Sequence, residues 1–241
     1  MMARIAVALA FALLIAASTG ARANTVGYAQ DEATHASADN AATLNQVEPA
    51  AQRGNAKAQY RLGRMYEKGQ GVAVDYAKAA HWYRMAADQG YAPAQSELGL
   101  LLRHGWGVAR RSAAAVKWFQ LAAKQGNAEG EANLGEMYSA GEGVPQSYAE
   151  AIDWFRAAAI QGDGRAQYDL GLMYEYGEGI PPDMLHAYMW CDIASAVLAG
   201  AERRDAADSR DQLGKFMNLA NTEQAQSMAI ACQASDYRKC F

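Results

Sequence analysis

Apolar residues recur at helical spacing along most of this chain, in segments that come in pairs. In the first pair, four apolar residues at i, i+4, i+7 and i+8 share one face of a helix over residues 58–66: Ala58, Leu62, Met65 and Tyr66. Gly69-x-Gly71 ends this helix, because glycine adopts the left-handed backbone of a C-terminal cap without a Cβ penalty. Asp75 is a good N-cap for a second helix, which ends at Gly90 and buries Ala79, Trp82, Tyr83 and Ala86.

This helix-turn-helix unit returns every 36 residues. Four sets of equivalent residues are each spaced 36 residues apart: Gly54, Gly90, Gly126 and Gly162; Gly63, Gly99, Gly135 and Gly171; the pairs Gly69/Gly71, Gly105/Gly107, Gly141/Gly143 and Gly177/Gly179; and Trp82, Trp118, Trp154 and Trp190. Such a period is typical of a solenoid, in which each unit buries its apolar face against its neighbours. We therefore expect an all-α solenoid with repeats at 54–89, 90–125, 126–161 and 162–200. Later second helices should begin at Ser147 and Asp183, and at Ser112 rather than the poor cap Arg111.

A glycine stands inside every first helix, where it costs about 1 kcal/mol relative to alanine. Four such costs in one register, from Gly63 to Gly171, imply a packing reason. We expect these glycines to let the two helices of each hairpin approach closely, with the Trp of the second helix covering the contact. Flexible hinges are a weaker explanation, because hinges rarely recur in every unit.

These motifs resemble the Sel1-like repeat family, a relative of the tetratricopeptide repeats. The shared pattern is Gly-x-x-x-Ala-Gln-x-x-Leu-Gly-x-Met-Tyr-x-x-Gly-x-Gly-Val, followed by Lys-Ala-x-x-Trp and Ala-Ala-x-x-Gly, and the first repeat matches it from Gly54 to Gly90. Departures are Leu101-Leu102 for Met-Tyr, Gly130-Glu131 for Ala-Gln, and Leu198 for the terminal glycine. The resemblance covers about residues 50–200 and implies a right-handed superhelical solenoid whose first helices line the concave face.

The N-terminus reads as a targeting segment. Arg4 precedes an apolar run over residues 5–17, and Ala21-Arg22-Ala23 is a small-x-small cleavage site. We expect a signal peptide over residues 1–23, cleaved after Ala23, which places the mature protein in the periplasm; a retained membrane anchor is the alternative. Residues 24–45 are expected to form a flexible leader, with a short helix from about residue 40 to 53 interrupted by Pro49.

Charge argues against two classes of partner. Cleavage would leave 20 basic and 26 acidic residues, a net charge of −6, with no basic run. A mildly acidic exported chain is a poor candidate for binding nucleic acid or an anionic membrane. No membrane span is expected after cleavage.

Residues 201–241 are expected to close the solenoid. An amphipathic helix over 201–219 should be followed by a last helix over 222–234, for which Asn221 and Gln224 form a capping box, and the outer face of this unit should be polar. A disulfide between Cys232 and Cys240 is expected in an exported protein, and no histidine lies near them to suggest a metal site. Cys191 occupies the position of Tyr83, Phe119 and Phe155, which favours a buried core residue over a reactive thiol.

Catalytic motifs are nearly absent from the sequence. No serine begins Ser-x-x-Lys or lies in Gly-x-Ser-x-Gly, and His81, His104 and His186 have no His-Glu-x-x-His context. Neither a cofactor nor a metal is predicted. Some cysteine-rich members of the family have been connected with β-lactam binding and hydrolysis, so the resemblance leaves a weak β-lactam- or peptidoglycan-directed hydrolase as an alternative.

Variable positions of the first helices fall at 61, 64 and 68 and every 36 residues after. They form a stripe that runs from basic, through apolar, to acidic with an aromatic end: Arg61, Arg64, Lys68, Glu97, Leu100, His104, Asn133, Glu136, Ala140, Asp169, Leu172 and Tyr176. Either this is a solvated face without function, or it is a groove for an extended peptide or a partner's helix. We expect an envelope adaptor or regulator. The resemblance implies a role such as restraining a sensor kinase or assembling polysaccharide or cell-wall machinery; a structural scaffold stays open.

Overall fold

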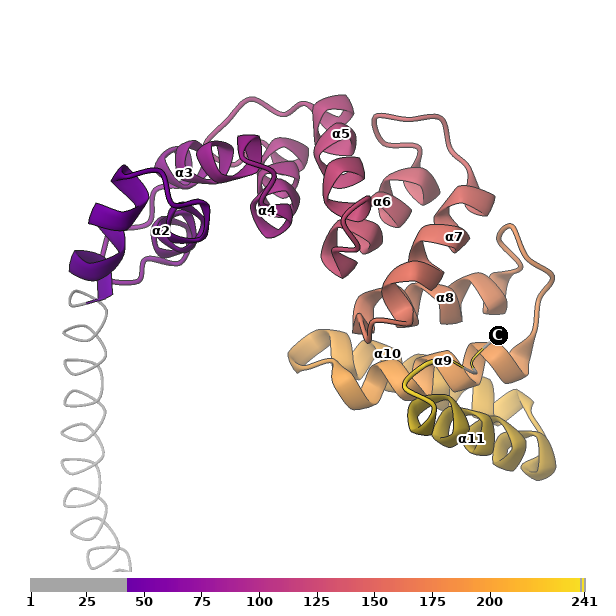
Figure 1. The fold of residues 1–241 in the computed structure, drawn as a ribbon. Coiled ribbons are helices and arrows are strands. Elements are labelled where there is room, and N and C mark those ends of the chain that lie inside the picture. Colours follow the sequence, from indigo (N-terminus) through magenta and orange to yellow (C-terminus); the bar gives the residue numbers. More distant parts are fainter. Residues whose placement is uncertain (1–42, 239, 241) are drawn as a thin grey trace, which may run out of the picture.

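The computed structural model describes residues 43–238 and residue 240, which form an arc of stacked helices (Figure 1). The signal peptide expected over 1–23 and most of the expected leader lie outside the described residues. The helices are α2 (Ala56–Lys68), α3 (Tyr76–Asp88), α4 (Ala92–His104), α5 (Ser112–Ala123), α6 (Ala128–Ala140), α7 (Tyr148–Ala159), α8 (Gly164–Tyr176), α9 (Met184–Val197), α10 (Gly200–Phe216) and α11 (Leu219–Ala234). The predicted all-α repeat solenoid is confirmed.

Inner and outer helices alternate along the arc. Helices α2, α4, α6 and α8 line the concave side, and α3, α5 and α7 form the convex side (Figure 1). Each inner helix packs against the outer helix that follows it, and each outer helix against the next inner one. The inner helices also touch one another, α4 with α6 and α6 with α8. The concave surface is therefore built almost entirely from the first helix of each repeat.

The short helix predicted before α2 is present, but it is not interrupted. Residues 43–52 are helical, with Pro49 inside the helix rather than interrupting it. Leu44 and Val47 pack against the core of the first repeat. Residues 43–45, expected in the leader, thus belong to the first layer of the solenoid.

Glycines end the inner helices as predicted. Gly69, Gly105, Gly141 and Gly177 have φ of 69°, 77°, 67° and 71°. Asp75, Ser147 and Asp183 cap outer helices through their side chains. The prediction for Ser112 is wrong, because it is the first residue of α5 and its hydroxyl instead donates to Glu142 Oε1 (2.9 Å). Arg111 precedes α5 without a side-chain cap.

The glycines inside the inner helices meet an aromatic ring of the outer helix. A Cβ built on Gly63, Gly99 or Gly135 would lie 2.6, 2.5 or 2.7 Å from the ring of Tyr83, Phe119 or Phe155, respectively. The close approach is confirmed, but the residue that covers it follows the Trp rather than being the Trp itself. The covering rings are buried, whereas Trp82, Trp118 and Trp154 are half-buried.

A ladder of buried amides explains the Ala-Gln motif. Gln59, Gln95 and Gln167 each donate to a backbone carbonyl eight residues earlier. In the third repeat Glu131 stands at the position of these glutamines. In each of the first three repeats, a glutamine 30 residues later donates a hydrogen bond to the side chain at this position: Gln89 to Gln59, Gln125 to Gln95, and Gln161 to Glu131. In the fourth repeat this donor is replaced by Val197, and the buried Oε1 of Gln167 has no hydrogen-bond partner among the described residues.

Helices α10 and α11 both pack against α9 at the C-terminal end. The N-cap of α11 is Asn218, which accepts from the amide of Asn221, so the predicted capping box at Asn221 is wrong. The outer surface is also less polar than predicted, because Phe216, Leu219 and Ile230 are 80%, 75% and 68% exposed.

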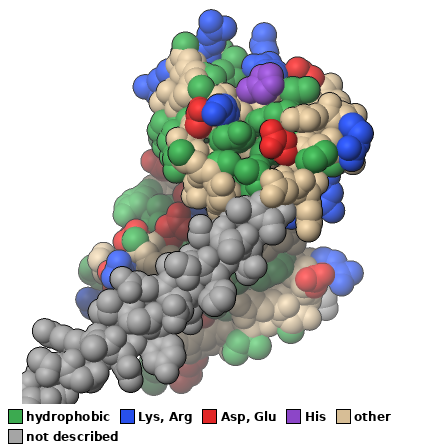
Figure 2. Space-filling model, turned by 90° about the vertical axis from the view of Figure 1, so that its left-hand side faces the viewer, with side chains coloured by type: hydrophobic (Ala, Val, Ile, Leu, Met, Phe, Trp, Pro, Cys, Tyr) green, Lys and Arg blue, Asp and Glu red, His purple; other side chains and the backbone are tan. Residues whose placement is uncertain are grey.

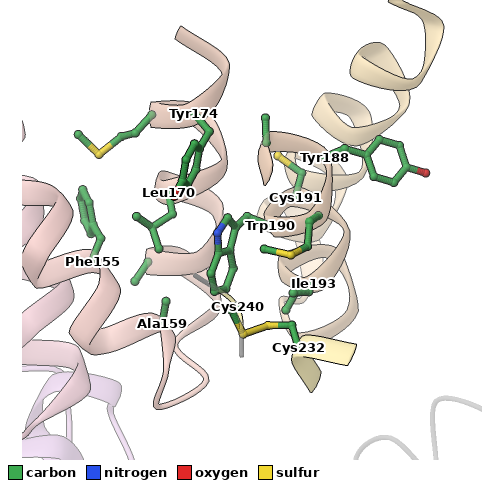
Figure 3. Close-up of a cluster of buried hydrophobic side chains, with 14 of the residues drawn as sticks. Phe155, Ala159, Leu170, Tyr174, Tyr188, Trp190, Cys191, Ile193, Cys232 and Cys240 are labelled. Atoms are coloured by element: carbon green, nitrogen blue, oxygen red, sulfur yellow. A yellow bond between two sulfur atoms is a disulfide. The ribbon is translucent and has the colours of Figure 1, made fainter. Parts of the chain in front are cut away.

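The largest apolar cluster extends from α6 to α11, and Figure 3 shows part of it. Trp190 is fully buried in it, between Leu170 of α8 and Cys191 and Ile193 of its own helix. Cys232 is joined to Cys240 by a disulfide, with a Cα–Cα distance of 4.8 Å, as predicted. Cys191 is free, and burial raises the pKa of its thiol to about 12, which agrees with a core residue rather than a reactive thiolate.

Candidate functional site

The concave groove is the surface formed by the inner faces of α2, α4, α6 and α8. All of the variable residues predicted to line it lie on these four helices. Exposed residues are Arg61, Lys68, His104, Ala140 and Tyr176; half-buried residues are Arg64, Glu97, Leu100, Glu136, Asp169 and Leu172. Asn133 does not belong to the surface, because it is fully buried and donates to the carbonyl of Glu129 in its own helix.

An ion-pair network crosses the middle of the groove and joins three repeats. Arg103 of α4 donates through Nη1 to Glu136 of α6 and through Nε to Glu142 in the following turn (3.1 Å). Arg165 of α8 lies 3.6 Å from the other oxygen of Glu136. Arg103 is largely shielded from water and donates to two carboxylates, which limits the conformations of its guanidinium. The centre of the stripe is therefore charged and preorganised, not apolar as the sequence suggested.

Half-buried acids lie between this network and the first repeat. Burial and the neighbouring carboxylates Glu129 and Glu67 raise the pKa of Glu97 to about 8, while Arg64 opposes the shift. Burial also raises the pKa of Glu129. The Arg64 guanidinium lies 5.8 Å from the ring centroid of Tyr60. Near neutral pH Glu97 is thus partly protonated, and its carboxyl can donate a hydrogen bond as well as accept one.

A cavity of about 350 Å³ opens beside the network towards the fourth repeat. Its walls include Arg103, Glu136, Asp169 and Leu172. Burial and the Glu136 carboxylate raise the pKa of Asp169 to about 7. This end of the groove combines an apolar wall with one carboxyl that titrates near neutrality.

Helix α10 closes the C-terminal end of the groove. A second cavity, of about 220 Å³, lies between Tyr168 and Asp169 of α8, Leu198, and Glu202 and Asp205 of α10. The hydroxyls of Tyr168 and Ser209 lie 3.0 Å apart and tie α10 to α8. Glu202 and Asp205 therefore add acidic side chains to this end of the groove. Tyr176, the last residue of α8, is 66% exposed.

Several groove residues escaped the sequence prediction: Tyr60, Arg103, Glu129, Glu142 and Arg165. The sequence does carry a signal for some of them, because charge changes between equivalent positions of the repeats. Arg103 occupies the position of Glu67, and Arg165 occupies the position of Lys57, Pro93 and Glu129. These positions lie directly beside the three that were compared, on the same helical face. The charges at these positions of the inner helices indicate Arg103, Glu129 and Arg165, whereas Glu142 lies in the turn after α6 and Tyr60 carries no charge.

The face shown in Figure 2, at the end of the arc that carries the first repeat, mixes basic, acidic and apolar side chains without a large area of one charge sign. Among the described residues no group of three or more His, Cys, Asp or Glu is placed to hold a metal ion. Within the same part of the chain, no helix is both long enough and apolar enough to cross a membrane.

Comparison with known proteins assigns the repeats. The Sel1 repeat model matches residues 56–91, 92–127, 128–163 and 164–196. Among solved structures, a Sel1 repeat protein from Oxalobacter formigenes is 29% identical over 80% of this chain and 80% of its own, with a TM-score of 0.65. The uropathogenic Escherichia coli protective antigen c5321, with an SLR fold, is 29% identical over 81% of this chain but only 45% of its own, with a TM-score of 0.60.

An immunity protein from Pseudomonas aeruginosa, Pa5087, is 20% identical over 81% of this chain and 75% of its own, with a TM-score of 0.50, and supports the fold alone. Among curated proteins none matches the chain. Sel1 repeat proteins generally mediate protein–protein interactions. Since the four matched repeats cover more than half of its length, the chain belongs to the Sel1 repeat family.

Proposed function

We propose that this protein is an exported adaptor or regulator of the cell envelope that binds a protein partner in its concave groove. The observation that carries the proposal is the network on Arg103, Glu136 and Glu142. Among the described residues, the ion pairs that join different repeats all involve Glu136 or Glu142, on the concave side or in the adjoining turns. Charged groups fixed in this way are preorganised for recognition, since less side-chain entropy is lost on binding.

The charges of the groove suggest the polarity of the partner. Arg61, Arg64 and Lys68 stand at its N-terminal end, and Glu202 and Asp205 stand at its C-terminal end. An extended peptide or a partner's helix that is acidic at one end and basic at the other would match this order. An envelope sensor kinase or the machinery of polysaccharide or cell-wall assembly is the kind of partner that the family resemblance implies.

Site-specific photo-crosslinking tests the proposal. A benzophenone amino acid is placed at Leu100 or Leu172, on the inner helices, and at Leu121 or Ile160 on the outer side as matched apolar controls. We expect groove positions to crosslink a discrete partner in cells and the outer positions to remain uncrosslinked. Crosslinks from the outer positions alone would place the partner on the convex side and refute the groove.

Export is tested separately from binding. Residues 1–23 support it, with one basic residue ahead of an apolar run and a small-x-small cleavage site. Mature protein should begin at Asn24 and appear in the periplasmic fraction. Recovery of the uncleaved 241-residue chain from the cytosol would refute this part of the proposal.

A further inference from the structure

An exposed aromatic ledge lies at the edge of the groove, where α4 turns towards α5. We define it by Tyr76, His104 and Trp106. The His104 and Trp106 rings are stacked, with centroids 4.5 Å apart and an angle of 21° between their planes. Tyr76, at the start of α3, packs against the other side of this turn, 5.7 Å from the Trp106 ring. Although it has two aromatic neighbours, Trp106 remains 45% exposed.

Packing within the solenoid does not require a tryptophan at this position. The other repeats carry Gln70, Glu142 and Glu178 there, and their inner helices end on the same left-handed glycine. A large aromatic ring that is held in place but still faces solvent is the usual form of a binding anchor. The stack on His104 limits the motion of the Trp106 ring before a partner arrives, which lowers the entropic cost of binding.

Positive charge gathers beside the ledge. Arg103, His104, Arg110 and Glu142 line a cavity of about 210 Å³, and Arg103 also lines the larger cavity of the groove, so the two cavities share one wall residue. Although burial opposes it, hydrogen bonds from Arg110, Ser112 and Arg103 lower the pKa of Glu142 to about 2, so both of its oxygens are engaged as a carboxylate.

Arg110 keeps most of its hydrogen-bonding capacity. Its side chain is 66% exposed, and only Nη2 has a hydrogen-bond partner among the described residues. Arg111, which is also exposed, follows it. Of the four residues that line the cavity, two are arginines and one is a glutamate, in a chain whose net charge is −4. An acidic ligand is therefore favoured at this point of an otherwise acidic protein.

We propose that the ledge and Arg110 dock an acidic segment of the partner protein, in which an aromatic ring stacks on Trp106 and a neighbouring carboxylate pairs with Arg110. This inference rests on the proposed function and names the chemistry of one end of the partner. The cavity holds about one side chain, which fits a single anchor residue of an extended peptide.

Titration of the mature, 15N-labelled protein tests the ledge through the indole N–H signal of Trp106. The probes are three acetylated pentapeptides: Glu-Glu-Phe-Glu-Glu, Glu-Glu-Ala-Glu-Glu and Lys-Lys-Phe-Lys-Lys. We expect the first to shift the Trp106 signal saturably and the other two to bind at least about tenfold more weakly, because each lacks one of the two contacts. Equal responses to all three peptides, or no shift at millimolar peptide, would overturn the proposal.

Variants separate the ledge from its surroundings. Trp106→Ala and Arg110→Gln should each weaken Glu-Glu-Phe-Glu-Glu binding about tenfold, and Lys124→Glu, on the outer side, should leave it unchanged. Arg110→Gln keeps the proposal falsifiable if Trp106→Ala unfolds the turn. A Trp106 shift with a chito-oligosaccharide but none with the peptides would make this a carbohydrate surface instead.

The peptide-binding tests of the ledge and the crosslinking test of the groove can fail independently of each other. Groove crosslinks at Leu100 or Leu172 that persist unchanged in Trp106→Ala and Arg110→Gln, without peptide binding, would refute the ledge and leave the groove intact. Absence of crosslinks at both positions would refute the groove even where the isolated peptide binds.

Discussion

Gly135→Ala tests the packing of the hairpins by the sign of its effect. The new Cβ would lie 2.7 Å from Cδ1 and Cε1 of Phe155, whose ring is almost completely buried. Two carbon atoms attract each other best at about 3.5–4.0 Å, so the ring or the helix must move by roughly 0.8 Å. In a close-packed interior this displacement passes to neighbouring side chains.

Two opposing terms set the magnitude. Alanine in a helix interior is more favourable than glycine by about 1 kcal/mol. Overpacking a filled core costs about 1–3 kcal/mol. Because the clash involves two atoms of a rigid, buried ring, we expect the packing term to win, with a net destabilisation of about 1–2 kcal/mol. In a chain of this size that lowers the melting temperature by about 2–8 °C.

Circular dichroism melts and urea unfolding of the four members of a double-mutant cycle measure the effect: the parent, Gly135→Ala, Phe155→Leu, and the combination. In the Phe155→Leu background a flexible side chain replaces the rigid ring, so Gly135→Ala should cost little or become stabilising. If Gly135→Ala stabilises the parent protein by about 1 kcal/mol, the full gain in helix propensity, the close-contact explanation is refuted.

Three further predictions address the carboxyls, the tail and the amide ladder. Because burial raises the pKa of Asp169 to about 7, the protonated carboxyl stabilises the fold fully below about pH 4, and this stabilisation is lost as the pH rises through 7. Asp169→Asn should therefore raise the melting temperature at pH 8 and reduce the fall of the melting temperature between pH 5 and 8. An unchanged pH profile of the melting temperature would contradict the assignment. Reducing Cys232–Cys240 should remove about 2–3 kcal/mol and speed amide exchange in the tail, while the main unfolding transition of the solenoid persists; its loss would show that the disulfide holds more than the tail. Val197→Gln should supply the donor that Gln167 lacks and stabilise by about 0.5–1.5 kcal/mol in urea unfolding, whereas destabilisation would indicate that the register of the ladder ends before the fourth repeat.

The fold could be predicted from the sequence because its determinants are local and repeated. Glycines that end helices, side-chain caps such as Asp75, and apolar spacing each act within one helix, and the 36-residue period carries them through four copies. The error over Trp82 and Tyr83 has a simple cause. Adjacent helical residues point about 100° apart, and spacing alone does not say which of two neighbouring aromatic rings faces the glycine.

The groove could be predicted only in outline. Periodicity identified the helices that line it, because every first helix has the same orientation. It did not identify the pairing of Arg103 with Glu136 and Glu142, which depends on the rotation between successive repeats. Nor did it show that Asn133 turns into the core, or that burial leaves Glu97 partly protonated near neutral pH.

Charge reversal in the groove tests the central claim most directly, once crosslinking has supplied the partner. Binding of the purified partner is measured by biolayer interferometry for Arg61→Glu/Arg64→Glu on the inner helix α2, and for Lys78→Glu/Lys117→Glu on the outer helices α3 and α5. We expect the groove pair to slow association and weaken binding at least tenfold, with unchanged helix content and a wild-type affinity that falls as salt rises, and the outer pair to bind normally. Loss of binding in the outer pair, with normal binding in the groove pair, would contradict the account and place the partner on the convex face.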